Sequence, residues 1–182
     1  IDLYGRIADA QAQVESVVEV REGVETGERI AETARQIEKL REALKTEIVK
    51  GQAQVERDGE RIVIRLVVQG SFYSGSAELA TDFMPVLKKI GKTITEAGGR
   101  IIIEGHTDDV PLSGHNRFRS NWDLSGARAG AVADYLSEHA DVPRERLMVR
   151  GMADTKPVAP NDTREGRAKN RRIEILVDAF GT

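Results

Sequence analysis

Residues 100–136 read RIIIEGHTDDVPLSGHNRFRSNWDLSGARAGAVADYL. The run 100–106 is apolar and rich in isoleucine, which is typical of a buried strand, whereas 121–140 carries apolar residues at helical spacing. A polar connection joins the two. Another helix-like segment precedes this unit and another strand-like segment follows it. Strands alternating with helices predict an α/β fold.

The segments on either side extend this pattern. Residues 52–68 show a period of two around Asp58-Gly59, which predicts two strands joined by a tight hairpin. Residues 78–98 predict a helix with Leu79, Phe83, Val86, Leu87, Ile90 and Ile94 on one face. Its Pro85 requires a start near Ala80 to Asp82. Strands at 146–151 and 171–179, joined by a long connection, complete a mixed sheet with helices packed on one face.

The first 50 residues differ in composition. They contain no proline and one aromatic residue, and residues with high helix propensity dominate. The sequence predicts one long helix or two, with Gly23 and Gly27 marking a break or hinge. Apolar positions from Ile30 onward form a narrow stripe: Ile30, Ala34, Ile37, Leu40, Leu44 and Ile48. The stripe either packs on the following domain or pairs with a second copy in a coiled coil. We place a helical linker or dimerisation segment at 1–50 and the folded domain at 51–182.

Bulk properties exclude several classes of protein. The 182 residues carry a formal net charge of −3, which argues against nucleic-acid binding through the overall field. The basic run 164–172 lacks interleaved aromatic residues, so no nucleic acid is expected there either. There is no cysteine and no apolar run long enough to span a bilayer. Because the chain begins at Ile1, we expect that an anchor or leader was removed upstream.

Asp108 and Arg128 are the candidate functional pair. Asp108 follows the strand 100–106, and Arg128 lies about two turns into the next helix, where its side chain leans toward the helix start. With Asn121 or Asp123 as the helix cap, the inner face comprises Leu124, Ala127, Ala131, Tyr135 and Leu136. The two charges can therefore face one crevice. They can form a salt bridge, a catalytic pair or the two halves of a ligand site.

Other chemistries have weaker support. His106, His115 and His139 lack metal-ligand spacing, and His106 beside a strand is typical of a structural histidine. Asp108 and Asp109 are adjacent and point apart in an extended segment, so they do not form an acid/base pair. No phosphate loop, dinucleotide motif or Ser/His/Asp order appears. We expect no catalytic residue, no metal and no cofactor.

Three segments together resemble the OmpA-like peptidoglycan-binding domain. They are EGHTD at 104–108, NWDLSGARAGAVADYL at 121–136 and RGMADTKPVAPNDTREGRAKNRRIEI at 150–175. The resemblance covers about residues 60–178. Within that family, the segment 111–125, PLSGHNRFRSNWDLS, is similar to the periplasmic region of flagellar stator B subunits, MotB or PomB. Its residues resemble those of the sodium-type PomB more closely. Sodium or proton coupling stays open.

The resemblance implies a non-catalytic domain that binds the diaminopimelate residue of the peptidoglycan stem peptide. Asp108 would hold the ammonium, and Arg128 the carboxylate, of its zwitterionic centre. Thr107 belongs to the same motif, and Asn121 and Leu124 match positions at the pocket rim. Arg172 matches the second arginine of Asn-Arg-Arg, with either a packing or salt-bridge role or a ligand contact. The lengthened stretch 108–121 predicts a partly covered pocket.

The resemblance also implies a setting. It predicts a periplasmic domain whose full-length protein is anchored in the inner membrane by an upstream segment. Its implied partners are peptidoglycan, a second copy in a homodimer, a stator A subunit of the MotA or PomA type, and flagellar ring proteins. The N-terminal helices would rearrange to let the domain reach the wall. The alternatives are an OmpA- or Pal-like envelope tether, or a docking module without constitutive wall binding.

Overall fold

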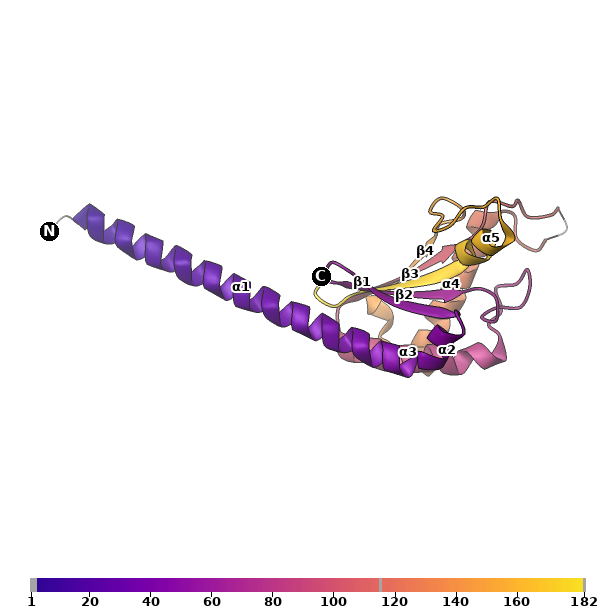
Figure 1. The fold of residues 1–182 in the computed structure, drawn as a ribbon, viewed down its shortest axis with the longest axis horizontal. Helices are drawn as coiled ribbons and strands as arrows, with labels where there is room; N and C mark the ends of the chain where they lie inside the picture. Colours follow the sequence, from indigo (N-terminus) through magenta and orange to yellow (C-terminus); the bar gives the residue numbers. More distant parts are fainter. Residues whose placement is uncertain (1–2, 115, 182) are drawn as a thin grey trace.

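A long N-terminal helix leads into an α/β domain (Figure 1). The computed structural model describes residues 3–114 and 116–181. Helix α1, Leu3–Ala43, runs without interruption through Gly23 and Gly27, so the predicted break is wrong. Glycine in a helix interior costs about 1 kcal/mol relative to alanine. The residues between and around these glycines favour helix, so two isolated costs of this size are too small to end α1.

Five strands form one mixed sheet. They are β1 (Ala53–Asp58), β2 (Arg61–Val67), β3 (Arg100–His106), β4 (Leu147–Gly151) and β5 (Arg172–Asp178), in the order β1-β2-β5-β3-β4. Only the β3–β4 pair is parallel among these neighbours. Gly59 supplies a positive φ of 62° at the β1–β2 turn, which confirms the predicted hairpin.

Helices α3 (Met84–Ala97) and α4 (Asn121–His139) cover one face of this sheet. The shorter helices are α2 (Lys45–Val49) and α5 (Arg164–Asn170), and 3-10 turns lie at Thr81–Phe83 and Arg144–Arg146. Helices α3 and α4, with the end of α1, supply most of the helical side of the main core. The mixed sheet with helices on one face is the predicted fold. Helix α5 lies in the segment that the sequence predicted as connection.

The last turns of α1, and Leu44 directly after it, belong to the domain core. Leu40 and Leu44 have no exposed surface, Ile37 is 5% exposed, and all three pack in the main hydrophobic cluster. The core thus includes side chains from before residue 51. Each buried leucine contributes about 2 kcal/mol relative to an exposed one. Packing on the domain is therefore confirmed for this part of the stripe, whereas Ile30 and Ala34 are exposed.

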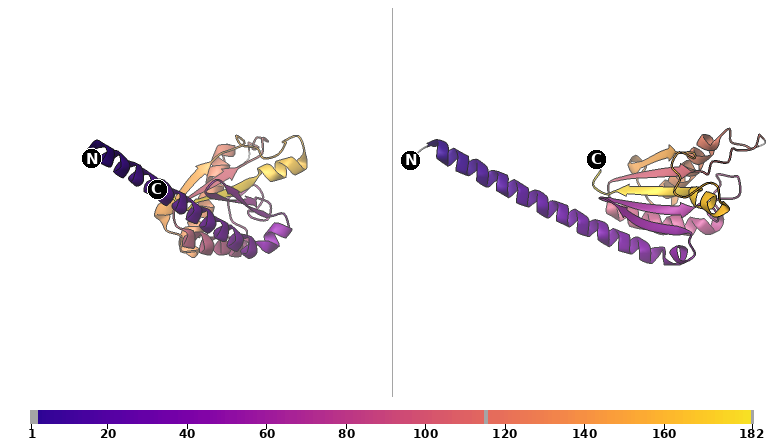
Figure 2. Two further views of the ribbon diagram at one scale, coloured as in Figure 1. Left: turned by 60° about the vertical axis from the view of Figure 1, so that its left-hand side comes forward. Right: turned by 45° about the horizontal axis from the view of Figure 1, so that its top comes forward.

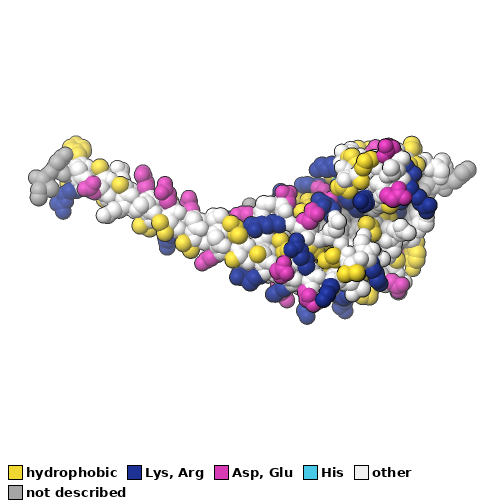
Figure 3. Space-filling model, viewed as in Figure 1, with side chains coloured by type: hydrophobic (Ala, Val, Ile, Leu, Met, Phe, Trp, Pro, Cys, Tyr) yellow, Lys and Arg dark blue, Asp and Glu magenta, His cyan; other side chains and the backbone are white. Residues whose placement is uncertain are grey.

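Most of α1 projects away from the domain. Both views in Figure 2 show one rod leaving the sheet. Its residues before Arg29 are exposed, including Ile7, Val14 and Val17, and Figure 3 shows apolar side chains at intervals along this part. Within residues 3–114 and 116–181, no helix has the length and apolar character needed to cross a membrane.

Helix α4 begins with a different cap from the one predicted. Ser120 is the N-cap, and its side chain accepts a hydrogen bond from the amide of Asp123. The expected caps Asn121 and Asp123 lie in the first turn, because serine in extended conformation directly before them serves the same purpose. The buried face comprises Leu124, Ser125, Arg128, Ala129, Val132 and Leu136. The predicted Ala127, Ala131 and Tyr135 are only partly buried, since the face is rotated by about one position.

Candidate ligand-binding cavity

A close approach between β3 and α4 places the candidate residues. Gly105 lies so near α4 that an added Cβ would come within 2.1 Å of the carbonyl oxygen of Ser125. Only glycine permits this contact. On the other side, the Ser125 hydroxyl accepts a hydrogen bond from the amide of Ala153, 3.1 Å away. The end of β3 is thereby fixed against the first turns of α4.

A cavity of about 440 Å³ opens beside this contact. Thr107 and Asp108 reach it from the end of β3, Asn121, Leu124 and Arg128 from α4. We call it the Asp108 cavity. The loop before α4 forms one wall through Val110, Pro111, Leu112, Ser113 and Asn116, and Gly75, Arg167 and Arg171 complete the lining. The lengthened loop therefore walls the cavity, whereas His115, also in this loop, lies outside the described residues.

The Asp108 carboxylate is buried and already bound on one side. The residue is 8% exposed, and its Oδ2 accepts a hydrogen bond from Nη1 of Arg171 at 2.5 Å. Its Oδ1 accepts from the amide of Val110 at 3.1 Å, which fixes the loop and the carboxylate together. Asp109 is exposed, as expected for adjacent residues that point apart. Asp108 thus presents an oriented anion to the cavity.

Arg128 is a buried cation that no described carboxylate contacts directly. It is 5% exposed, and its Nε donates to the carbonyl oxygen of Ser76 at 2.9 Å. Its guanidinium carbon lies 5.4 Å from the ring centre of Phe72. Burial, followed by the charge of Arg171, lowers the pKa of Arg128 to about 10, although Asp108 opposes the shift. The fold therefore holds the Arg128 guanidinium in a buried position, where its positive charge is energetically unfavourable.

Asp108 and Arg128 share the cavity without neutralising each other. Among the ion pairs of residues 3–114 and 116–181, Asp108 is joined to Arg171 and not to Arg128. The direct salt bridge that the sequence left open is therefore absent from this part of the chain. One wall offers a hydrogen-bond acceptor with negative charge, and another offers a forked donor with positive charge. Such a pair suits a ligand that carries both signs on neighbouring atoms.

The other predicted residues have mainly supporting positions. The Thr107 hydroxyl donates to the carbonyl oxygen of Asp108 at 2.8 Å, so it is turned toward the backbone. The Asn121 amide donates to the carbonyl oxygen of Val110 at 3.0 Å and fastens the loop to α4. Leu124 is 4% exposed and gives the cavity an apolar surface. All three line the cavity, and their part in ligand binding stays a prediction.

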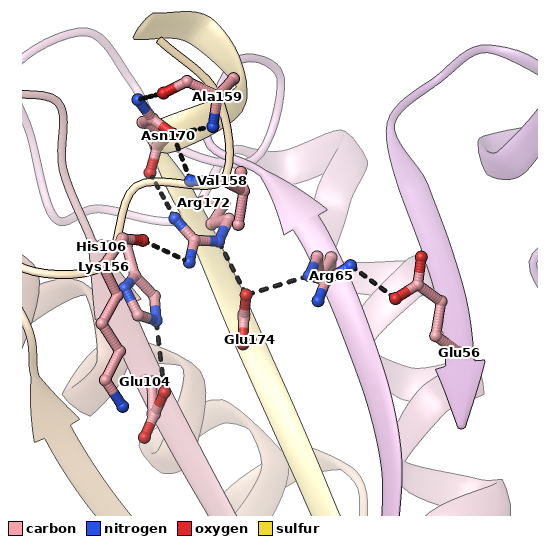
Figure 4. A network of polar contacts seen from close by, with 10 residues as sticks. All are labelled: Glu56, Arg65, Glu104, His106, Lys156, Val158, Ala159, Asn170, Arg172 and Glu174. Carbon is pink, nitrogen blue, oxygen red and sulfur yellow. Dashed lines mark hydrogen bonds and ion pairs between the residues drawn. The ribbon is translucent and has the colours of Figure 1, made fainter. Parts of the chain in front are cut away.

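Arg172 lies apart from the cavity. It is 3% exposed, and its Nε donates to Oε1 of Glu174 at 2.8 Å. Its other nitrogens donate to the carbonyl oxygens of Asn170 and Lys156 (Figure 4). All of these contacts lie within the chain. Of the two roles left open for Arg172, this geometry favours packing and salt bridging over ligand contact.

Arg172 belongs to a buried polar network across the sheet. Glu174 also accepts from Arg65, and Glu104 accepts from Arg150 at 3.2 Å. His106 Nε2 lies 3.3 Å from a Glu104 oxygen, in a geometry that falls short of a hydrogen bond. Burial, and then the charge of Arg172, lowers the pKa of His106, although Glu174 and Glu104 oppose the shift. Burial raises the pKa of Glu174, but hydrogen bonds from its arginine partners outweigh that effect and lower it.

The same network contains a possible metal-binding group. One ligand atom from each of Glu104, His106 and Glu174 lies within 4.8 Å of the others. Arginines, however, already bind both carboxylates: Arg150 on Glu104, and Arg65 and Arg172 on Glu174. A divalent cation would be buried among these positive charges, which is unfavourable. The prediction that the chain binds no metal stays a prediction, and the network is adequately explained as structural.

Sequence reasoning missed Arg171, the first arginine of the Asn-Arg-Arg segment. Successive side chains of an extended segment point in opposite directions. When Arg172 turns into the sheet network, Arg171 must point the other way, toward the Asp108 cavity. This alternation was a usable signal. Phe72 and Ser76, which contact Arg128, lie in an irregular loop and left no comparable pattern.

Comparisons with known proteins agree with this architecture. Residues 71–171 match the OmpA family model. Motility protein B of Bacillus subtilis (strain 168) is 33% identical over 151 residues, which cover 82% of this chain and 56% of that protein. The chain thus spans little more than half the length of curated relatives such as this one.

Solved structures extend the match to three dimensions. A putative MotB-like protein from Desulfovibrio vulgaris is 30% identical with a TM-score of 0.77, over 86% of this chain and 97% of that one. The cell wall anchor of the T6SS from Pseudomonas aeruginosa is 35% identical with a TM-score of 0.68, over 76% and 95%. The segments around Asp108, Arg128 and Arg171 fall within the matched range 71–171. This chain therefore belongs to the OmpA family, with an OmpA-like domain of the MotB type.

Proposed function

We propose that the domain anchors a larger assembly to the cell wall by binding the diaminopimelate residue of peptidoglycan. The free end of that residue carries an ammonium and a carboxylate on one carbon. Asp108 accepts hydrogen bonds from the ammonium, and Arg128 donates to the carboxylate. No bond is broken, so the proposed activity is binding and not catalysis.

One observation carries this proposal. Arg128 is 5% exposed, its pKa is lowered to about 10, and no ion pair of the described residues neutralises it. Leaving a buried cation without an anionic partner is costly, and such a cost is commonly retained where a ligand supplies the missing charge. The Asp108 carboxylate in the same cavity adds the second half of a zwitterion site.

Co-sedimentation with purified diaminopimelate-type peptidoglycan tests the site. The wild-type chain is compared with Asp108→Asn and Arg128→Met, and circular dichroism confirms that each variant folds. Asp109→Asn and Arg119→Met are matched controls, because they remove the same charges at exposed positions that do not line the cavity. We expect the first two variants to lose binding and the controls to retain it. Equal sedimentation of all five proteins would overturn the site.

Lysine-type peptidoglycan provides a sharper chemical control. A lysine side chain carries the ammonium but no carboxylate beside it, so Arg128 would lack its partner. We expect wild-type binding to fall strongly on this wall. Equal binding to both walls would contradict the role of Arg128 while leaving that of Asp108 intact.

Within the cell, the proposal places the domain in the periplasm as part of a flagellar stator. An upstream segment would anchor the protein in the inner membrane beside a MotA- or PomA-type subunit, and flagellar ring proteins would contact it. Similarity to motility protein B supports this setting. A stator chimera carrying this domain should restore motility to a strain lacking its own B subunit. If the chimera with the unsubstituted domain is motile and the Arg128→Met chimera is not, wall binding is linked to the stator role.

A homodimer through α1 is part of the same proposal. The projecting half of the helix exposes apolar residues at intervals of three, four or seven positions: Leu3, Ile7, Val14, Val17 and Val24. Such a stripe favours pairing with a second copy. Analytical ultracentrifugation should find a dimer, and a monomer at high concentration would contradict it. Crosslinks that lock α1 should block motility if the helices rearrange to extend the domains to the wall.

A general envelope tether is the second candidate function. The similarity to the cell wall anchor of the T6SS favours this function, because the match covers 95% of that structure. Wall binding is common to both candidates, so sedimentation does not separate them. Restored motility in the chimera supports the stator, whereas wall binding without restored motility supports the tether.

A further inference from the structure

A second cavity lies on the other side of Arg128. Its volume is about 450 Å³, and it shares Gly75, Arg128 and Arg171 with the Asp108 cavity. Arg164, the first residue of α5, lines only this second space. We call it the Arg164 cavity. The two cavities are therefore neighbours that share two arginines in their linings.

Positive charge in the Arg164 cavity is not balanced from within. Its described lining contains three arginines and no aspartate or glutamate. Arg171 is paired with Asp108 on the far side, and Arg128 donates to a carbonyl oxygen. Among residues 3–114 and 116–181, no hydrogen bond or ion pair joins Arg164 to another side chain. A cavity with this excess of positive charge favours the binding of an anionic group.

Much of the remaining lining is apolar or aromatic, and Gln69, Ser74 and two glycines complete it. Phe72 is 6% exposed beneath the Arg128 guanidinium, and Val68 and Ala168 extend the apolar surface. Tyr73 is 48% exposed, with its hydroxyl 3.3 Å from that of Thr81. The cavity is thus suited to a carboxylate on a short aliphatic body and not to a bare inorganic anion, which would leave this apolar surface unused.

We infer that the Arg164 cavity binds the carboxylate of the amino acid attached to diaminopimelate in the stem peptide. This inference rests on the proposed function. With the free centre of diaminopimelate in the Asp108 cavity, its second centre continues into the peptide. Arg128 and Arg171 face both cavities, so the adjoining residue passes directly beside them. The two cavities would then recognise two residues of the stem peptide instead of one.

Either peptide neighbour can supply that carboxylate. A glutamyl residue joined through its side chain precedes diaminopimelate and keeps a free α-carboxylate, whereas an alanine that follows it carries a terminal carboxylate. The chemistry is the same, and two pairs of probes separate the sources. Each pair consists of a dipeptide with the free carboxylate and the same dipeptide with that group amidated.

Isothermal titration calorimetry of the 182-residue chain tests the inference. The probes are diaminopimelate alone, γ-glutamyl-diaminopimelate and its α-amide, and diaminopimelyl-alanine and its amide. The test variant is Arg164→Gln. Lys169→Gln is the matched control, because it removes one positive charge from the same helix outside both cavities. Neither position belongs to the pair that holds diaminopimelate.

We expect one acid dipeptide to bind wild type about 5-fold more tightly than its amide, as for a charge-assisted contact at a partly exposed arginine. The preference should vanish in Arg164→Gln and persist in Lys169→Gln, while diaminopimelate binds all three proteins equally. Equal binding of acids and amides to wild type would overturn the inference alone, as would a preference that survives Arg164→Gln. Failure of every probe, diaminopimelate included, would overturn the proposed function and this inference with it.

Discussion

Asp108 is paired with Arg171, through Oδ2 and Nη1 at 2.5 Å, and not with Arg128, which faces the same cavity. The pairing fixes the carboxylate from one side and leaves its other surface toward the cavity. It also places a second positive charge near Arg128, which contributes to the lowered pKa of that side chain. Arg171 therefore acts on both halves of the proposed site without being one of them.

Arg171→Gln should weaken diaminopimelate binding less than Arg128→Met does. We expect about a 5-fold loss, because Asp108 loses the ion pair that orients it but keeps its charge. Arg128→Met should remove measurable binding, since the ligand carboxylate then lacks its donor. Calorimetry with diaminopimelate measures both. An equal loss in the two variants would mean that Arg171 contacts the ligand directly.

Arg128→Met should stabilise the ligand-free domain. The pKa of Arg128 falls to about 10 on folding, so below pH 10 the folded state carries a penalty for burying the charge. That penalty is complete at neutral pH and disappears only as pH rises from about 10 toward the higher pKa of an arginine in the unfolded chain. We expect the free energy of unfolding at pH 7 to rise by about 1–3 kcal/mol in urea titrations.

Arg119→Met provides the control for that measurement. The Arg119 side chain is 92% exposed, so its replacement should change stability by less than about 0.5 kcal/mol. A less stable Arg128→Met protein would show that the hydrogen bond to Ser76 and the contact with Phe72 outweigh the burial of charge.

His106→Gln should reduce the loss of stability in mild acid. Burial, and then Arg172, lowers the pKa of His106, so the unfolded chain binds the proton more readily than the folded one. The stability that depends on neutral His106 is complete above the unfolded pKa of about 6.5 and is lost as pH falls toward the folded value. Wild type should therefore lose up to about 1.4 kcal/mol per pH unit more than the variant between pH 6.5 and 5.

Urea denaturation at several pH values measures this difference. His139→Gln is the control, because it removes an imidazole whose side chain is 60% exposed and should leave the wild-type slope unchanged. If wild type and His106→Gln lose stability in parallel, another group is responsible for the acid sensitivity.

Gly105→Ala should destabilise the domain and weaken ligand binding together. The added methyl would lie 2.1 Å from the Ser125 carbonyl, so β3 and α4 must move apart. We expect a loss of about 1–3 kcal/mol, with reduced diaminopimelate affinity because Asp108 and Arg128 are carried by these two elements. Gly130→Ala on α4 meets nothing within 4 Å and should instead stabilise by about 0.5–1 kcal/mol. Unchanged binding in a folded Gly105→Ala protein would contradict the proposed coupling.

The regular elements of the domain were readable because their signals are local. Alternation around Asp58-Gly59 and the isoleucine run 100–106 predicted strands that the structure confirms. Helix α5 was missed because its seven residues, Arg164–Asn170, carry charge and one glycine but no apolar stripe. It is started by Thr163, which caps the amide of Gly166.

The site was predictable in part. Asp108 and Arg128 were singled out by their charge and their positions after a strand and within a helix, and both line one cavity. Their partners were not, because an ion pair between residues 108 and 171, or a hydrogen bond between 128 and 76, depends on how distant segments meet. The uninterrupted helix through Gly23 and Gly27 was missed for the opposite reason, since a local penalty was given too much weight.

Helix α1 also determines how the domain bears a mechanical load. A helix of 41 residues extends over about 60 Å, and only its last turns are embedded in the domain. Tension along its axis would reach the core as shear through Ile37, Leu40 and the adjoining Leu44, and all three contacts would resist sliding together. A sideways force would instead peel them away one after another. The domain should therefore hold firmly when pulled in line with α1 and detach at a lower force when bent away from it.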